Sequence, residues 1–173
     1  MKHILVPTDF SIQSLRPVHE IVRRNPQQSL HIHLVHLLHV PTDITDLLFQ
    51  KRHHMYKKVP DHFMQAMEML KNKYQHQIKW MAIEFYYGHR LSILNDIISN
   101  LKIEEVYLLD HHSYPPPFEQ SADLISLINR CKLPLIRLPQ KVKQGVPGDG
   151  NLLSSLFTDE YQVTATAKLV QPA

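Results

Sequence analysis

Polar side chains follow two apolar runs of this chain, and such positions can carry chemistry. Thr8, Asp9 and Ser11 come directly after the apolar residues 4–6, and the segment 110–114, reading DHHSY, follows a later apolar run. Open α/β sheets bind their ligands at the carboxyl ends of their strands, near the point where the strand order reverses. These polar residues therefore predict a ligand cleft between two strand ends.

Several histidines are spaced so that they could bind a metal ion. His111 and His112 are adjacent in the second polar segment, where His39 or Asp9 could join them in holding a metal or an anion. Structural metal sites need three or four convergent ligands, and two adjacent histidines do not supply them. We therefore predict no metal site here.

His31 and His33 lie two residues apart on one face of an expected strand, a spacing that can chelate a metal. A half-exposed strand face explains the pair equally well.

The sequence lacks the common catalytic motifs. It contains no G-x-S-x-G, no P-loop, no H-E-x-x-H and no C-x-x-C. The single cysteine, Cys131, stands near the end of an apolar helical pattern, which is typical of a buried packing residue rather than a nucleophile. We expect a protein that is not an enzyme.

The hydrophobic periodicity predicts five strands that alternate with four helices. The expected strands are 2–7, 30–40, 78–87, 105–109 and 133–138, and the expected helices are 11–24, 61–77, 91–101 and 119–131. This alternation is typical of a parallel, doubly wound sheet with right-handed crossovers and helices on both faces. The segment 41–59 lacks a clear period and is interpreted as a long connection with a short helix.

The first strand and helix have clear boundary signals. Pro7 cannot donate a backbone hydrogen bond and should end the strand, and Thr8, Asp9 and Ser11 are candidate caps for the following helix. Asp9 therefore has two possible roles, as a cap or as a contact to a ligand. The second helix shows methionines at 64, 67 and 69, which are more typical of a core face than of a groove for a partner.

Composition limits the classes of protein that this chain can be. Its 173 residues are 43% hydrophobic and 20% charged, which suits one globular α/β domain. The formal net charge of +3 is too small and too scattered to indicate a nucleic-acid partner. One cysteine excludes an internal disulfide, and no apolar run is long enough to span a membrane, so we expect a cytoplasmic protein with no membrane partner.

The last part of the chain has a different composition. Residues 140–173 contain three of the four glycines, so we divide the chain into an α/β domain at 1–139 and a linker with a C-terminal extension at 140–173. A short helix is expected at 152–157, and 161–170 is interpreted as a strand or a disordered tail. This tail could lie across the sheet edge of its own subunit or of a partner.

The opening residues, MKHILVPTDFS, resemble the start of universal stress proteins, and the resemblance extends over residues 1–139. It implies an adenine nucleotide alpha hydrolase-like sheet with strand order 3-2-1-4-5. Asp9 matches the family's aspartate at the ribose or adenine, His39 and Val40 match its His-Val at the adenine edge, and Gly88 resembles the glycine that ends strand three. The residues assigned on this basis to a remnant ligand cleft are Pro7, Thr8, Asp9, His39, Val40, Asp110 and His111.

This chain departs from the family at the phosphate-binding loop. Universal stress proteins that bind ATP have a G-x-x-G loop after strand four, whereas this chain has Asp110 there and no glycine between Gly88 and Gly145. A carboxylate about 5 Å from a phosphate charge costs roughly 3 kcal/mol at an effective dielectric constant of about 20. We therefore expect no cofactor, and in particular no ATP bound in the family's usual mode.

The resemblance implies a stress-response or regulatory protein, and it also implies assembly. Family members commonly dimerise through strand five, so we expect a homodimer through Leu133–Leu138 or through the tail that follows. The alternative function is a small-molecule or nucleotide-binding module that uses the cleft between strands one and four. An enzyme on a related adenine-binding fold is the third possibility, and the missing phosphate loop argues against it.

Overall fold

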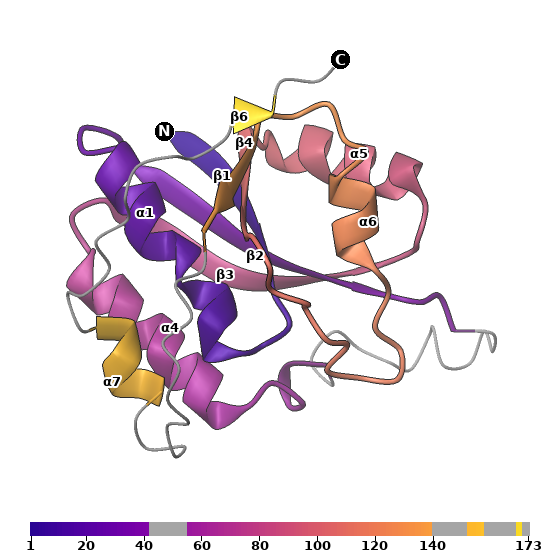
Figure 1. Cartoon of the computed structure of the whole chain (residues 1–173), viewed down its shortest axis with the longest axis horizontal. Helices are drawn as coiled ribbons and strands as arrows, with labels where there is room; N and C mark the ends of the chain where they lie inside the picture. Colours follow the sequence, from indigo (N-terminus) through magenta and orange to yellow (C-terminus); the bar gives the residue numbers. More distant parts are fainter. Residues whose placement is uncertain (42–54, 140–151, 158–168, 171–173) are drawn as a thin grey trace.

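The structure is a doubly wound α/β sandwich (Figure 1). In this computed structural model the described residues are 1–41, 55–139, 152–157 and 169–170. The six strands of the sheet are β1 (Lys2–Pro7), β2 (Leu30–Leu38), β3 (Ile78–Tyr87), β4 (Glu105–Leu109), β5 (Leu135–Leu138) and β6 (Leu169–Val170). Their order is β3-β2-β1-β4-β5-β6, and the first five pair in parallel. The predicted five-stranded parallel order 3-2-1-4-5 is confirmed.

The central strand β1 contributes to the core on both faces of the sheet. Ile4, Leu5 and Val6 are all inaccessible to solvent. Ile4 and Val6 point into one half of the core, and Leu5 points into the other, because successive side chains of a strand alternate between its faces. A strand buried on both faces has no need of polar alternation, which accounts for the continuous apolar run.

The helices form two layers. They are the 3-10 helix η1 (Ile12–Leu15), α1 (Pro17–Arg24), α4 (Asp61–Lys73), α5 (Leu91–Leu101), α6 (Leu124–Ile128) and α7 (Leu152–Phe157). In Figure 1, α1, α4 and α7 lie on one side of the sheet, and α5 and α6 lie on the other. Phe63 and Leu70 of α4 are fully buried in the first layer, and Leu94 of α5 is fully buried in the second. The methionine-bearing helix α4 also buries Met67, as expected of a core face, whereas Met64 and Met69 are exposed.

The single helix predicted over 11–24 is wrong in one respect, because the structure divides it. Ser11 is the cap, and its side chain accepts a hydrogen bond from the Ser14 backbone at the start of η1. Pro17 then begins α1 as a separate helix. Proline is favoured in the first turn of a helix because its missing N–H has no intrahelical partner there.

The helix predicted over 119–131 is wrong over much of its length. It is reduced to α6, which begins after Asp123, whose side chain accepts the cap hydrogen bond from the Ser126 backbone. The preceding residues are held by β2 instead: Ser121 forms an isolated antiparallel bridge with Leu38, and the Ala122 N–H donates to the Leu37 carbonyl at 2.8 Å. A tertiary contact therefore replaces the first turn of the expected helix.

Other boundaries differ by a few residues. β2 ends at Leu38 rather than at residue 40, α4 ends at Lys73 rather than at residue 77, and β5 begins at Leu135 rather than at residue 133. The strands predicted at 2–7, 78–87 and 105–109 and the helix at 91–101 are confirmed. Most of the connection at 41–59 lies outside the described residues. Cys131 follows α6 and is half-buried against the α5–α6 layer.

Described parts of the C-terminal extension lie against the domain at 1–139. The helix predicted at 152–157 is confirmed as α7, and its Leu156 is buried in the core beneath α1 and α4. Of the strand predicted at 161–170, the structure describes Leu169–Val170 as β6, antiparallel to β5 opposite Leu135 and Ile136. The extension therefore covers an edge of its own sheet. No described helix is long and apolar enough to cross a membrane.

Because Leu156 is buried in the core, its truncation should destabilise the whole domain. We expect Leu156→Ala to lower the free energy of unfolding by about 2 kcal/mol, the lower part of the range for buried leucine truncations. In a chain of this length the melting temperature should fall by about 4–8 °C. Met69→Ala removes an exposed apolar side chain from α4 and should have little effect. A Leu156→Ala protein that melts like the parent would show that α7 contributes nothing to the fold.

Candidate functional site

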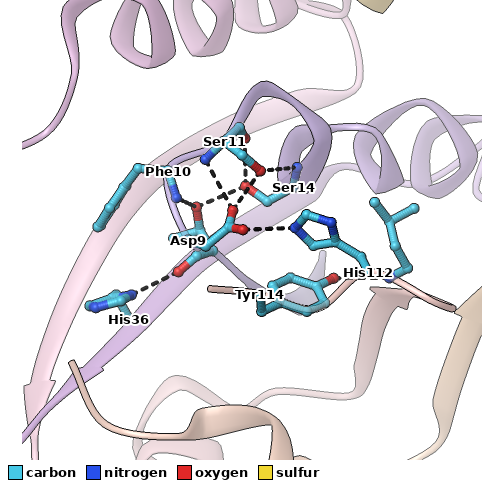
Figure 2. A network of polar contacts seen from close by, with 9 residues as sticks. Asp9, Phe10, Ser11, Ser14, His36, His112 and Tyr114 are labelled. Carbon is cyan, nitrogen blue, oxygen red and sulfur yellow. Dashed lines mark hydrogen bonds and ion pairs between the residues drawn. The ribbon is translucent and has the colours of Figure 1, made fainter. Parts of the chain in front are cut away.

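The candidate site is organised around the buried carboxylate of Asp9, just beyond β1 (Figure 2). One carboxylate oxygen accepts hydrogen bonds from the Ser11 backbone N–H at 3.0 Å and from the Ser11 hydroxyl at 2.6 Å. The other oxygen lies 2.7 Å from Nε2 of His112, which comes from the loop after β4. Asp9 thus joins the carboxyl ends of the two central strands.

A second set of hydrogen bonds shapes the turn that presents Asp9. The Phe10 N–H donates to the Thr8 hydroxyl, which lies 3.0 Å from the Ser14 hydroxyl. The Ser14 hydroxyl donates in turn to the Ser11 carbonyl at 2.8 Å. Phe10 itself has a left-handed backbone, with φ of 60°. These short polar side chains hold the strained turn between β1 and η1 closed.

The loop after β4 folds back over its own strand. The hydroxyl of Tyr114 accepts a hydrogen bond from the Leu109 N–H at 2.9 Å. The ring of Tyr114 packs edge-on against His112, with centroids 4.4 Å apart. His111 and Tyr114 both have positive φ, at 61° and 46°. Neither is glycine, so the surrounding contacts must offset the strain of these conformations.

The hydrogen bonds at Asp9 decide its protonation state. Burial alone would raise the pKa of the Asp9 carboxyl, but the hydrogen bonds from His112 and Ser11 outweigh burial and lower the pKa below its ordinary value. Asp9 is therefore ionised at neutral pH. Burial raises the pKa of the Tyr114 phenol well above its ordinary range, so Tyr114 remains a neutral hydroxyl.

The segment after the prolines crosses the end of β2. His36 connects the two, because its Nδ1 lies 2.7 Å from the Thr8 carbonyl and its Nε2 lies 3.0 Å from the Ser121 hydroxyl. Burial lowers the pKa of the His36 imidazole, which favours its neutral form. The ring of Phe118 packs against the rings of Phe10 and His36, at centroid distances of 5.5 and 5.7 Å. The chain's own aromatic side chains therefore occupy the region beyond β1 and β2.

The structure separates the residues that the sequence assigned to one ligand cleft. Pro7, Thr8 and Asp9 are buried at the end of β1 as expected. His39 and Val40 follow β2 and are exposed, Val40 by 52%.

The two assigned residues after β4 also differ from Asp9 in their surroundings. Asp110 forms an ion pair with Arg137 of β5 at 3.8 Å, and the His111 side chain is 82% exposed. The partner of Asp9 is instead the next residue, His112.

His112, Tyr114 and His36 are the site residues that the cleft assignment missed. The sequence predicts His112 only as half of a possible metal pair that Asp9 could join, whereas in the structure its Nε2 lies 2.7 Å from the Asp9 carboxylate. Among the residues that the structure describes, no group of three histidine, cysteine, aspartate or glutamate side chains could hold a metal ion. The spacing of 103 residues between Asp9 and His112 carries no local signal that a periodicity could reveal.

Comparisons with known proteins find similar structures but no similar sequences. No protein-family model matches the chain, and no curated protein matches it. Among solved structures, the hypothetical protein MJ0577 matches with a TM-score of 0.52 at 14% identity, covering 82% of this chain and 98% of that one. The likeness to MJ0577 shows the fold, in agreement with the strand order of the sheet.

Two further matches are described as universal stress proteins. One, from Burkholderia pseudomallei, has a TM-score of 0.48 at 10% identity and covers 80% of this chain and 96% of its own. The other, from Arabidopsis thaliana with AMP bound, has a TM-score of 0.46 at 12% identity and covers 86% of this chain and 98% of its own. The similarity to MJ0577 and the strand order together confirm the predicted doubly wound α/β fold.

Because the pKa of the Asp9 carboxyl is lower in the folded protein, the free energy of unfolding should decrease as the pH falls into the acid range. The contribution of Asp9 is fully present above the unfolded-state pKa of about 3.8 and is lost as the pH falls through the lower folded-state pKa. We expect Asp9→Asn to lower the free energy of unfolding at pH 7 by about 2 kcal/mol, typical of hydrogen bonds to a charged group. The difference from the parent should shrink below pH 4.

Chemical denaturation of both proteins between pH 2.5 and pH 7 measures this difference. Asp96→Asn is the matched control, because Asp96 is an exposed carboxylate on α5. An Asp9→Asn protein as stable as the parent at every pH would show that the contacts to Ser11 and His112 contribute nothing.

Proposed function

We propose that this chain is a non-catalytic stress-response or regulatory protein that does not bind ATP in the mode usual for universal stress proteins. The observation that supports this most directly is that one oxygen of the Asp9 carboxylate is hydrogen-bonded to Ser11 and the other to His112. The Asp9 side chain is only 2% exposed, so a ribose could reach its carboxylate only by displacing His112 or Ser11. Such a displacement would leave a buried charge with fewer partners, which is costly.

The backbone donors at the end of β4 are also in use. The Leu109 N–H is bonded to the Tyr114 hydroxyl, and the Asp110 N–H donates to the Leu138 carbonyl at 2.7 Å. Phosphate-binding loops depend on free backbone N–H groups that point at the anion. The segment Pro115–Pro117 adds three residues without any N–H, and the Asp110 carboxylate adds a negative charge. These features support a role without a bound triphosphate.

The hydrogen bond made by the Ser11 hydroxyl also supports a non-catalytic role. In a catalytic triad the serine hydroxyl bonds to the imidazole, which then takes its proton. Here the Ser11 hydroxyl donates to the Asp9 carboxylate instead, at 2.6 Å. The imidazole of His112 therefore has no bonded hydroxyl to activate among the contacts that the structure describes at Asp9.

Titration calorimetry with ATP and magnesium tests the proposal. We expect no saturable heat with up to about 1 mM nucleotide, since a carboxylate close to a phosphate weakens binding by about a hundredfold. A His112→Ala variant, checked for folding, should bind no better than the parent if the Asp110 charge and the prolines also exclude phosphate. Micromolar affinity of the parent for ATP would refute this proposal. Binding of adenosine without ATP would instead favour the alternative of a small-molecule module in the same cleft.

The homodimer that the family resemblance implies remains part of this proposal. β6 is paired with β5 opposite Leu135 and Ile136, so a partner strand at Leu133–Leu138 would have to replace β6 or pair beyond it. We therefore propose that β6 competes with a second copy of the chain for the edge of β5. Short edge coverings of this kind are a known way to limit association of sheets.

Light scattering at tens of micromolar protein tests the dimer. We expect the parent to give a dimer mass, and the double variant Leu169→Pro/Val170→Pro to raise the dimer fraction at lower concentrations. The two prolines remove the N–H groups with which β6 could pair. A strictly monomeric parent, or a double variant that dimerises less well than the parent, would contradict competition for the β5 edge.

A further inference from the structure

A cavity lies on the sheet at the end opposite to the Asp9 site. It is lined by His31 and His33 of β2, Trp80 and Glu84 of β3, and Leu101, the last residue of α5. It is shallow and largely open to solvent, with a volume of about 230 Å³. Trp80 is 37% exposed there, which is a large exposure for the only tryptophan of the chain.

The sequence of β3 explains why the cavity exists. Trp80, Ala82 and Glu84 are on one face of the strand, because side chains alternate along it. The short side chain of Ala82 stands between two long ones and opposite His33 of β2. The space above Ala82 is therefore bounded by an indole at one end and a carboxylate at the other.

A chain of hydrogen bonds fixes the carboxylate of Glu84. One of its oxygens accepts from the Tyr86 hydroxyl, and the other lies 2.7 Å from Nδ1 of His33. Nε2 of His33 lies 3.1 Å from Nδ1 of His3. If Nδ1 of His33 carries the proton, its Nε2 can accept from His3, and every group in the chain has a partner.

Two imidazoles near the cavity, those of His3 and His31, have a pKa below the ordinary value, which favours their neutral form. Burial lowers the pKa of His3 and of His31, and repulsion from neighbouring imidazoles lowers both further. Lys102 lowers the pKa of His3 and Glu104 raises it, while the N-terminal amino group lowers that of His31. The cavity therefore combines aromatic rings with the carboxyl group of Glu84.

We propose that this cavity binds a small organic cation, with an ammonium group at Glu84 and a flat apolar body against Trp80 and Leu101. Tryptophan offers the best ring face for a cation, and a nearby carboxylate supplies the opposite charge. The ring of Trp80 is already positioned by the ring of His33, with centroids 4.8 Å apart. Leu101 supplies an apolar wall for the body of the ligand.

Other ligand classes fit the cavity less well. An anion would meet the carboxyl group of Glu84, which has no hydrogen to donate to it when ionised. A metal ion would need three converging ligands, and no such group occurs among the described residues. The preferred ligand therefore carries a positive charge and an apolar body together.

The fluorescence of Trp80 reports on this site directly, because the chain has one tryptophan. At pH 7.5 we expect 2-phenylethylamine to change the emission in a saturable way, with a dissociation constant near 1 mM. The neutral 2-phenylethanol should bind about tenfold more weakly, and phenylacetate should not bind. Alcohol or carboxylate binding as tightly as the amine, or no saturable change with the amine, would overturn the proposal.

Three variants locate the site, each checked for folding by thermal denaturation. Glu84→Gln should weaken amine binding about tenfold, whereas the control Glu68→Gln, on the outer side of α4, should leave it unchanged. Ala82→Leu should fill the cavity and abolish binding, which tests the site even if Glu84→Gln does not fold. Trp80→Leu should weaken binding measured by calorimetry. Unchanged affinity in folded Glu84→Gln or Ala82→Leu protein would overturn the assignment.

The pH dependence of amine binding provides a further test, because the proposal predicts the direction in which the affinity changes. Protonation of His3 and His31 in acid adds positive charge to the histidine cluster at the amino end of the sheet, where His33 contacts Glu84. Amine binding should therefore weaken from pH 7.5 to pH 5, although the amine itself stays charged. Binding that strengthens on acidification would contradict a cation site.

Discussion

A buried carboxylate must be fully hydrogen-bonded, and this requirement governs how the carboxyl end of the sheet is built. Asp9 meets it with Ser11 from its own turn and His112 from the loop after β4. An ionised group without such partners would be costly to bury, so His112 must stay in place. The positive φ values of His111 and Tyr114 on either side of it are one cost of that position.

The same requirement accounts for the rest of the site. With His112 fixed, Tyr114 packs on its ring and accepts from Leu109, and the chain continues across β2 to the contact between His36 and Ser121. The expected helix after β4 therefore starts late, at Leu124. Open α/β sheets bind ligands at the carboxyl ends of their strands, whereas here side chains of the chain itself lie over the ends of β1 and β2.

The two ends of the sheet thus differ in which side chains are exposed to solvent. The carboxyl end is occupied by contacts between residues of the chain, whereas the amino end leaves Trp80 exposed beside Glu84. The C-terminal extension adds a third feature, because α7 joins the core and β6 covers part of β5. The exposed face of Trp80 therefore lies at the end of the sheet opposite to the one where open α/β sheets bind their ligands.

The sequence alone determined the fold class, because apolar runs and helical periods are local patterns. The run at 4–6, the strand over Ile78–Tyr87 and the helix over Leu91–Leu101 each carry their own signal. It also identified Asp9 as a key residue. Only the tertiary structure decided that His112 rather than His111 meets Asp9, and that His33, Trp80 and Glu84 line a cavity. Such pairings depend on how loops and strands distant in the chain pack together, and no local period encodes that packing.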